Sequence, residues 1–263
     1  MKKLSETHVL ARILAAKRKR VEDSQLRVPE VIVRKMASTA GPVPSFRKAL
    51  EADTGTHIIA EIKKASPSAG VLIDDLDVAV LAGTYARAGA SAISVVTEED
   101  FFQGSIAWVG IAARSSGLPV LRKDFVFDSY QLAETRAAGA SAILLIVAML
   151  EPNELRELLE ACTEFGIDAL VEVHDETELE EAIGAGASIV GVNNRDLKTF
   201  DVNIETGMRL GKQIPERVLF VAESGIQKKS DVVRLGDAGA DAFLVGERLI
   251  RSEDPAAALK ELL

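Results

Sequence analysis

Short apolar runs alternate along the chain with segments in which apolar residues recur at the spacing of a helix. From residue 58 onward the runs fall into two interleaved sets, and each run has the length of one strand buried on both faces. The first set is Ile58 to Ile62, Pro119 to Lys123, Ala169 to Val173 and Val218 to Ala222, and the second is Ala92 to Val96, Ala142 to Val147, Ile189 to Val192 and Ala242 to Val245. The pattern therefore predicts eight strands.

A segment compatible with a helix follows each predicted strand, for example Asp77 to Ala88, Tyr130 to Ala138, Glu154 to Phe165 and Lys228 to Ala238. The tripeptide Ala-Gly-Ala closes helical patterns at residues 88–90, 138–140, 185–187 and 238–240, where glycine can adopt the left-handed conformation that ends a helix. A unit of about 25 residues repeated eight times predicts a (β/α)8 TIM barrel. A doubly wound open sheet is disfavoured, because the near-equal units show no longer crossover.

Residues 1–50 follow a different pattern and predict a helical extension in front of the barrel. Val9 to Asp23 has apolar residues at helical spacing among many Lys and Arg, and Ser45 to Asp53 predicts a short helix after two prolines. The extension is too short to bury a core of its own. We therefore expect it to belong to one domain with the barrel at residues 51–263.

Composition and charge narrow the class of protein. The 263 residues carry a formal net charge of -9, which argues against a nucleic-acid surface built from clustered Lys and Arg. The dense basic run at residues 17–20 lies in a helical pattern and is interpreted as a solvated face. No run of about 18 apolar residues occurs. We therefore expect a cytoplasmic protein without a nucleic-acid or membrane partner.

Cysteine and histidine usage limits the chemistry further. The single Cys162 excludes an intramolecular disulfide and fits a reducing compartment. Because it lies in a helical pattern, a packed thiol is favoured over a nucleophile. His8, His57 and His174 are scattered without the spacing of metal ligands, so we expect no metal site.

Charged residues close every strand of the first set. They are Glu61 and Lys63 at the first strand, Arg122, Lys123 and Asp124 at the third, Glu172 at the fifth and Glu223 at the seventh. Alternate strands contribute one layer at the mouth of a barrel, so we expect these side chains to meet there, with Lys64 facing away. Such a layer perturbs proton affinities as acid-base catalysis requires. A structural layer of ion pairs would leave the same pattern.

Three loops rich in serine or glycine suggest a phosphate site. They are residues 66–70 (Ser-Pro-Ser-Ala-Gly), 223–226 (Glu-Ser-Gly-Ile) and 244–247 (Leu-Val-Gly-Glu). A short helix from Glu247 to Ile250 would add its N-terminus, where anions bind. The carboxylate of Glu247 must then point away, so that only its N–H contributes. Plain turns are the alternative interpretation.

Six segments together resemble the indole-3-glycerol phosphate synthase family of tryptophan biosynthesis. They are residues 58–70 (IIAEIKKASPSAG), 118–125 (LPVLRKDF), 170–175 (LVEVHD), 190–197 (VGVNNRDL), 221–226 (VAESGI) and 243–250 (FLVGERLI). They cover the barrel in order, and the extension also resembles the family. The resemblance implies a carboxy-lyase that needs neither metal nor organic cofactor. Its reaction closes the ring of 1-(2-carboxyphenylamino)-1-deoxyribulose 5-phosphate and releases carbon dioxide and water.

The resemblance also implies roles for individual residues. Lys123 matches the general acid that protonates the ketone oxygen of the substrate, a role that suits a lysine whose pKa lies near the working pH. Glu172 matches the general base or the stabiliser of a cationic intermediate. Glu61 would position Lys63 or assist proton transfer, and Lys63 would pair with the anthranilate carboxylate and serve as a second acid.

The other matched residues would bind and enclose the substrate. They are Asn193 and Arg195 near the substrate hydroxyls and the catalytic layer, Glu223 and Ser224 at the seventh strand, Ser66, Gly225, Gly246 and the N–H of Glu247 at the phosphate, and Phe125 in an apolar wall. The extension would complete this wall as part of a lid.

Two other functions fit the same residues. A Schiff-base lyase or aldolase also uses lysines at strand ends, and borohydride trapping with substrate would identify it. A regulator that binds a phosphorylated sugar would retain its activity without Lys123. We expect a monomer that binds a small phosphorylated molecule, with a weak homodimer as the alternative.

Overall fold

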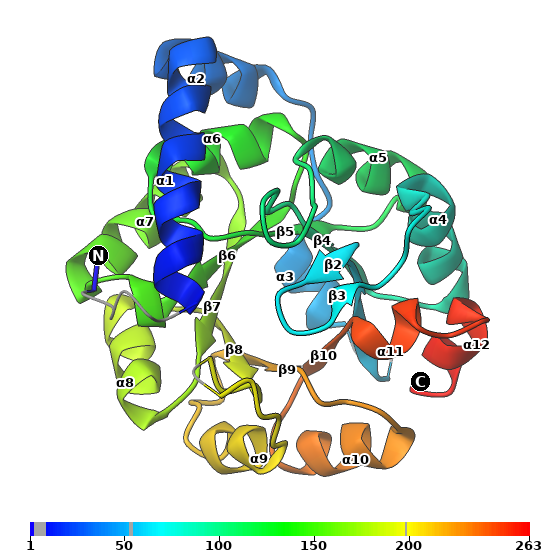
Figure 1. Ribbon diagram of the computed structural model, residues 1–263. Helices are drawn as coiled ribbons and strands as arrows, with labels where there is room; N and C mark the ends of the chain where they lie inside the picture. The colour runs from blue at the N-terminus through cyan, green and yellow to red at the C-terminus, as the bar shows by residue number, and fades with distance from the viewer. Residues whose placement is uncertain (3–8, 53–54, 198) are drawn as a thin grey trace.

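The computed structural model describes residues 1–2, 9–52, 55–197 and 199–263, and its centre is a closed barrel of parallel strands (Figure 1). Around the ring the order is β1-β10-β9-β8-β7-β6-β5-β4, so that β1 pairs with both β4 and β10. The bounds are β1 His57–Ile62, β4 Ala92–Val96, β5 Val120–Lys123, β6 Ala142–Ile146, β7 Asp168–Val173, β8 Ile189–Asn193, β9 Leu219–Glu223 and β10 Ala242–Val245. The predicted TIM barrel is confirmed, and the closing pair of strands excludes the open sheet.

The strand bounds agree with the predicted ones to within one residue at each end. β5 begins at Val120 because Pro119 has no N–H to give to a ladder. β9 extends to Glu223, which makes this carboxylate part of the strand. A short antiparallel hairpin, β2 (Ala65–Ser66) and β3 (Gly70–Val71), occupies the loop after β1.

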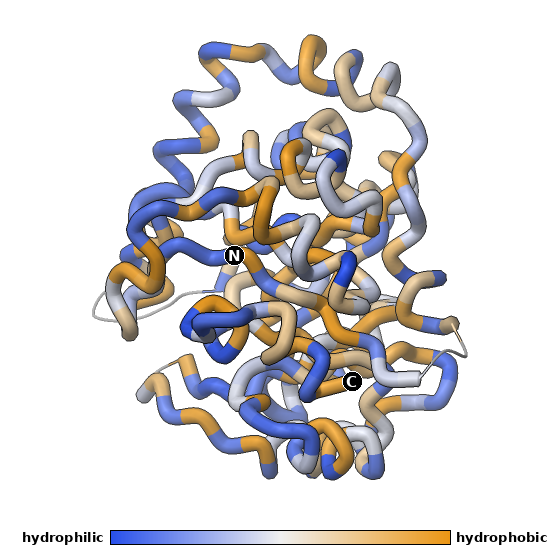
Figure 2. The backbone as a smooth tube through the Cα atoms, turned by 90° about the vertical axis from the view of Figure 1, so that its right-hand side faces the viewer, coloured by the Kyte–Doolittle hydropathy of each residue, from blue (hydrophilic) through white to orange (hydrophobic). Residues whose placement is uncertain are grey.

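Helices form the outer layer of the barrel. Their bounds are α4 Val78–Ala88, α5 Ala107–Ser116, α6 Ser129–Ala137, α7 Pro152–Phe165, α8 Glu176–Ala185, α9 Glu205–Gly211, α10 Lys229–Asp237, α11 Glu247–Ile250 and α12 Pro255–Lys260, with a 3-10 turn at Val147–Met149. Hydrophobic and hydrophilic positions alternate along these helices (Figure 2), as amphipathic helices on a core require. The central glycines of the Ala-Gly-Ala tripeptides have φ between 89° and 105°, so they end helices in the predicted left-handed conformation.

The extension consists of α1 (Val9–Arg27), α2 (Glu30–Thr39) and α3 (Phe46–Leu50). The sequence did not predict α2, because its Val-Ile-Val run is typical of strands. The helix nevertheless forms directly after Pro29, and it packs on α6 through a small core of its own. This core consists of Val21, Val33, Ala37, Tyr130 and Ala133. The short helix α3 ends at Leu50, and its predicted end, Asp53, lies outside the described residues.

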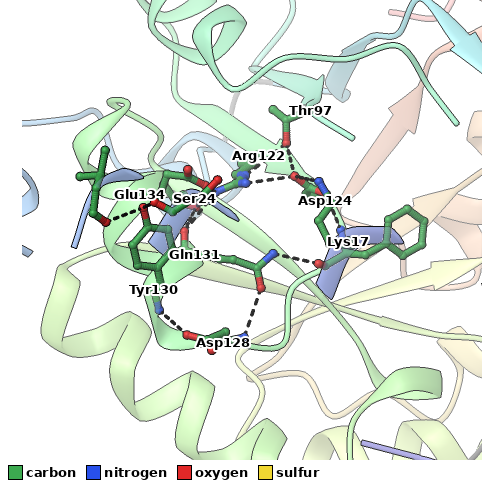
Figure 3. A network of polar contacts seen from close by, with 12 residues as sticks. Lys17, Ser24, Thr97, Arg122, Asp124, Asp128, Tyr130, Gln131 and Glu134 are labelled. Atoms are coloured by element: carbon green, nitrogen blue, oxygen red, sulfur yellow. Dashed lines mark hydrogen bonds and ion pairs between the residues drawn. The ribbon is translucent and has the colours of Figure 1, made fainter. Parts of the chain in front are cut away.

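A buried polar network fixes α1 to the barrel (Figure 3). Lys17 is only 2 % exposed, and its Nζ lies 2.8 Å from Oδ1 of Asp124 and 2.7 Å from Oε2 of Glu99. The interpretation of residues 17–20 as a wholly solvated face was therefore wrong for Lys17. Thr97 and Arg122 also donate to Asp124, at 2.6 and 3.0 Å. Arg122 and Asp124, which flank Lys123 in the sequence, thus link β5 to α1 and α6. They do not join the charged layer that contains Lys123.

None of the helices in the described part of the chain has both the length and the apolar character that a membrane span requires.

Candidate active site

A cavity of about 640 Å³ opens at the carboxyl ends of the barrel strands, within the usual size range of small-molecule sites. The predicted site residues that line it are Glu61, Lys63, Ser66, Lys123, Phe125, Glu172, Asn193, Arg195, Ser224, Gly225, Gly246 and Glu247. Glu223 is fully buried and reaches the site through Lys123. Lys64 borders a separate shallow hollow beside Asp74 and Trp108, as expected for a side chain out of phase with Lys63.

The charged side chains of alternate strands meet in one layer. Nζ of Lys123 on β5 lies 2.6 Å from Oε2 of Glu223, 3.8 Å from Oε2 of Glu61 and 3.8 Å from Oε2 of Glu172. Nζ of Lys63 lies 2.6 Å from the other oxygen of Glu61. Two ammonium groups and three carboxylates of β1, β5, β7 and β9 therefore form one coupled set, as the alternation of charges predicted.

The three carboxyl groups of this layer differ in proton affinity. Burial raises the pKa of Glu223 to about 7, and the neighbouring charges of Glu172 and Glu61 add to the rise against the attraction of Lys123. Burial acts in the same direction on Glu172, but the contact with His174 at 3.4 Å and the charge of Lys123 lower its pKa to about 2. Burial also opposes ionisation of Glu61, whose pKa is nevertheless lowered by Lys63 and Lys123. Groups with divergent pKa values in one cleft are typical of acid-base sites.

The pKa of Lys123 differs from the expectation. Burial alone would lower it, but Glu223, Glu61 and Glu172 together raise it above the usual value for lysine. The condition under which a lysine suits this role, a pKa that neighbouring charges and burial place near the working pH, is therefore not met in the structure. The alternation of charges predicted that these groups meet, but not that all three carboxylates lie within 3.8 Å of the ammonium group of Lys123.

A tight turn follows β9 and lines the cavity. Ser224 and Gly225 have φ of 62° and 81°, and a left-handed serine is a strained conformation that persists mainly at functional sites. Asn194 holds the turn, because its Nδ2 donates to the carbonyl of Ser224 at 3.1 Å while its Oδ1 accepts from the N–H of Gly207 at 2.8 Å. The turn is thus fixed beside the cavity before any ligand binds.

The other predicted phosphate elements lie around the same cavity. Gly246 is the N-cap of α11, and the helix begins at Glu247. The carboxylate of Glu247 lies 3.0 Å from Nε of Arg251 and 3.8 Å from a guanidinium nitrogen of Arg195, so arginines engage it. Ser66 accepts a hydrogen bond from the N–H of Ala69 at 3.2 Å, which leaves its hydroxyl proton available to a ligand.

Apolar side chains form another part of the cavity wall. The rings of Phe102 and Phe125 lie 6.0 Å apart at 43°, and the wall continues with Val9, Leu10, Ile13, Leu144 and Ile146. The sequence analysis missed Phe102. Its loop is held by Glu98, a fully buried carboxylate that accepts from the N–H groups of Phe101 and Phe102 at 2.8 and 3.0 Å. The acidic run after the second predicted strand, Glu98 to Asp100, was the available signal.

Gly191 of β8 gives Glu223 the space that it occupies. A Cβ atom at this position would overlap the Oε1 atom of Glu223. We expect Gly191→Ala to displace the carboxylate from Lys123 and to lower turnover about tenfold, with a loss of about 1–3 kcal/mol in stability from overpacking. Steady-state kinetics and thermal unfolding would measure both effects. Gly184→Ala, whose Cβ would meet no atom within 4 Å, is the control, and unchanged turnover in Gly191→Ala would contradict the coupling.

Other candidate chemistry lies away from the cavity. Cys162 is buried in α7, and burial raises the pKa of its thiol to about 12, as expected for a packed thiol. Across the described ranges of the chain, no group of three or more His, Cys, Asp or Glu side chains is arranged to hold a metal ion.

A closed (β/α)8 barrel with acid-base groups, fixed turns and an apolar wall around one cavity at its carboxyl face defines a barrel enzyme of the acid-base type. The model of the family described as indole-3-glycerol phosphate synthase matches residues 10–262. The chain belongs to this family, and the activity that goes with membership is a lyase reaction of tryptophan biosynthesis.

Relatives support the assignment over nearly the whole chain. The indole-3-glycerol phosphate synthase of Roseiflexus sp. (strain RS-1) is 49 % identical over 262 residues, which cover 97 % of each chain. That of Chlorobaculum tepidum is 47 % identical over 249 residues, or 93 % of this chain and 96 % of the relative. Among solved structures, 3-hexulose-6-phosphate synthase from Salmonella typhimurium has a TM-score of 0.63 at 13 % identity over 79 % of this chain and 96 % of that one, a similarity of fold alone.

Proposed function

We propose that the charged layer carries out the indole-3-glycerol phosphate synthase reaction on 1-(2-carboxyphenylamino)-1-deoxyribulose 5-phosphate. The ring carbon that bears the carboxylate bonds to the ketone carbon, carbon dioxide leaves, and loss of the former ketone oxygen as water completes the indole ring. Lys123 protonates that oxygen as the bond forms. An alkoxide is more basic than any amine, so the transfer remains favourable although three carboxylates raise the pKa of Lys123.

Glu61 and Lys63 form the second acid of the proposal. The 2.6 Å contact with Glu61 keeps the ammonium group of Lys63 directed into the cavity, where it pairs with the substrate carboxylate and later protonates the departing hydroxyl. Glu172, whose pKa is lowered to about 2, stays ionised and serves as the base that removes the last proton or stabilises the preceding cation. Asn193 and Glu223 hold these groups in place.

The phosphate of the substrate binds in the turns at the ends of β9 and β10. The supporting observations are the left-handed Ser224 and Gly225, the start of α11 after Gly246, and the free hydroxyl proton of Ser66, all beside one cavity. Arg195, 3.8 Å from the carboxylate of Glu247, contributes positive charge next to the site. The aromatic ring of the substrate then faces Phe125.

We further propose that the extension forms part of the substrate lid. Ile13 of α1 lines the cavity and is 3 % exposed. We expect Ile13→Ala to raise KM about tenfold, the scale of lost apolar contacts in a pocket, with a smaller effect on kcat. Leu26→Ala is the matched control, because Leu26 lies near the far end of the same helix and is 83 % exposed. An unchanged KM in Ile13→Ala would contradict a role of α1 in binding.

One observation carries the functional proposal: the ammonium group of Lys123 faces three carboxylates at the mouth of a cavity with an apolar wall. A Schiff-base enzyme needs a neutral amine and therefore a lowered lysine pKa, the opposite of what these carboxylates produce. The decisive experiment supplies the carboxyphenylamino-deoxyribulose phosphate and follows indole fluorescence. Absence of product, or trapping of a covalent adduct by borohydride, would overturn the proposal. We also expect the enzyme to act as a cytoplasmic monomer.

A further inference from the structure

His174 occupies a position that the reaction outlined above does not use. It follows Glu172 by two residues, and its ring lies between two carboxylates. Nε2 is 3.4 Å from Oε1 of Glu172, and Nδ1 is 2.9 Å from Oε2 of Glu178. The side chain is 13 % exposed and does not line the cavity. His174 therefore contacts the carboxylate of Glu172 without reaching a ligand.

The contacts of the ring determine how many protons it carries. Oε2 of Glu178 accepts from the backbone N–H of His174 at 2.8 Å as well as from Nδ1, and a carboxylate offers only acceptors. Nδ1 must therefore hold a proton. In a neutral ring the lone pair of Nε2 would then lie 3.4 Å from the negatively charged Oε1 of Glu172. This repulsion disappears when Nε2 is protonated too, so the geometry favours an imidazolium ion between two carboxylates.

The charges around the pair favour the same state. Burial alone would lower the pKa of His174, but Glu172 and Glu178 raise it to about 10. Glu172 is faced by Lys123 from β5 and is influenced by Glu61 from β1 and Glu223 from β9. Lys123 lies closer to Glu223, at 2.6 Å, than to Glu172, at 3.8 Å. The buried Glu172 therefore needs a second cation to remain ionised.

We propose that His174 is a positioning residue, an imidazolium ion that fixes Oε1 of Glu172 and leaves Oε2, the oxygen facing Lys123, to act on the substrate. The inference rests on the proposed role of Glu172. Removal of the imidazolium charge lets the pKa of Glu172 rise from its lowered value toward or above the usual one. The ionised form, which persists in the native protein as the pH falls, is then lost at a higher pH.

The first test observes the proton directly and needs no activity. Nitrogen-15 NMR of the full chain with labelled imidazole rings distinguishes doubly protonated from neutral histidine, and comparison with His174→Gln assigns the signal among the three histidines. We expect both ring nitrogens of His174 to stay protonated at pH 8. A ring that is neutral at pH 7 would overturn the proposal. The measurement reports the protonation of the ring in the wild-type protein without any turnover, so its result does not depend on the proposed reaction.

The second test measures the effect on Glu172. A carbon-13 titration of labelled glutamate carboxyl groups, assigned with Glu172→Gln, should show the pKa of Glu172 about 1–3 units higher in His174→Gln than in the wild type. We expect kcat to fall about 10- to 100-fold with KM within threefold, and a larger loss in His174→Leu, which cannot donate to Oε1. Glu178→Gln, which keeps an acceptor for Nδ1 but removes the charge, should give a smaller shift.

A matched control separates positioning from general stability. His57 is also a buried histidine, but its ring contacts Ser91 and the carbonyl of Ala52. It lies at the start of β1, whereas Glu61 and the charged layer lie at the end of that strand. His57→Gln should leave the pKa of Glu172 unchanged even if it lowers thermal stability. An unchanged titration of Glu172 in folded His174→Gln would overturn the proposal. An inactive wild-type enzyme with a doubly protonated His174 would overturn only the proposed function.

Discussion

Lys123→Ala is expected to lower turnover by about two to four orders of magnitude, the scale of losing a positioned general acid. Lys63, the other lysine that lines the cavity, is held by Glu61 at 2.6 Å for its own proposed role and is not expected to replace the ammonium group of Lys123. The turns proposed to bind phosphate follow β9 and β10 and are not changed, so KM should move little. Indole fluorescence at saturating substrate measures kcat, and its dependence on substrate concentration gives KM.

Lys64→Ala is the matched control for this substitution. Lys64 follows Lys63 in the chain but lies outside the cavity, so its removal should leave turnover unchanged. In Lys123→Ala the surrounding carboxyl groups lose their shared cation and are expected to take up protons as their pKa values rise. Circular dichroism would establish that the variant is folded. Wild-type turnover in Lys123→Ala would exclude the proposed reaction mechanism.

Glu172→Gln is expected to lower turnover by about two to three orders of magnitude. Glutamine keeps the size of the side chain and can still contact His174, but it can neither accept the last proton nor stabilise a cation as a carboxylate does. Since carbon dioxide leaves before that proton, single-turnover experiments with excess enzyme should show carbon dioxide release less affected than indole formation. In Lys123→Ala both should fall equally, because that step comes first.

Glu180→Gln provides the control for the loss of a carboxylate. Glu180 is an exposed residue of α8. Its replacement by glutamine should change neither the rate of carbon dioxide release nor that of indole formation. Equal losses of carbon dioxide release and indole formation in Glu172→Gln would contradict a role of this residue after decarboxylation. The comparison of the two variants thus tests whether Lys123 and Glu172 take part in the reaction, and whether Lys123 acts before Glu172.

The fold was predictable because its signals are local and repeated. Apolar runs such as Ile58 to Ile62 predict strands buried on both faces, and Ala-Gly-Ala tripeptides mark where helices end. α2 was missed because tertiary packing of Val33 and Ala37 on α6 overrides the strand preference of its Val-Ile-Val run. A sequence pattern alone cannot show such a partner.

The sequence predicted those features of the candidate site that follow from the alternation of side chains along a strand. It did not predict those that depend on contacts between residues far apart in the chain. Phase placed Lys63 in the charged layer and Lys64 outside it. It could not show that Lys17, from a helix more than 100 residues earlier, would bind Asp124, nor that His174 would lie between two carboxylates. The raised pKa of Lys123 likewise depends on distances across the barrel, which no local pattern contains.

The chain order of the functional groups divides the barrel into two unlike halves. Both lysines of the charged layer come from the half that ends with β6, whereas Glu172, Glu223 and the turn at Ser224 come from the half that begins with β7. The first half alone would hold both lysines without the turn at Ser224, and the second half alone would hold that turn without either lysine. The proposed reaction therefore requires both halves of the barrel to be folded against each other.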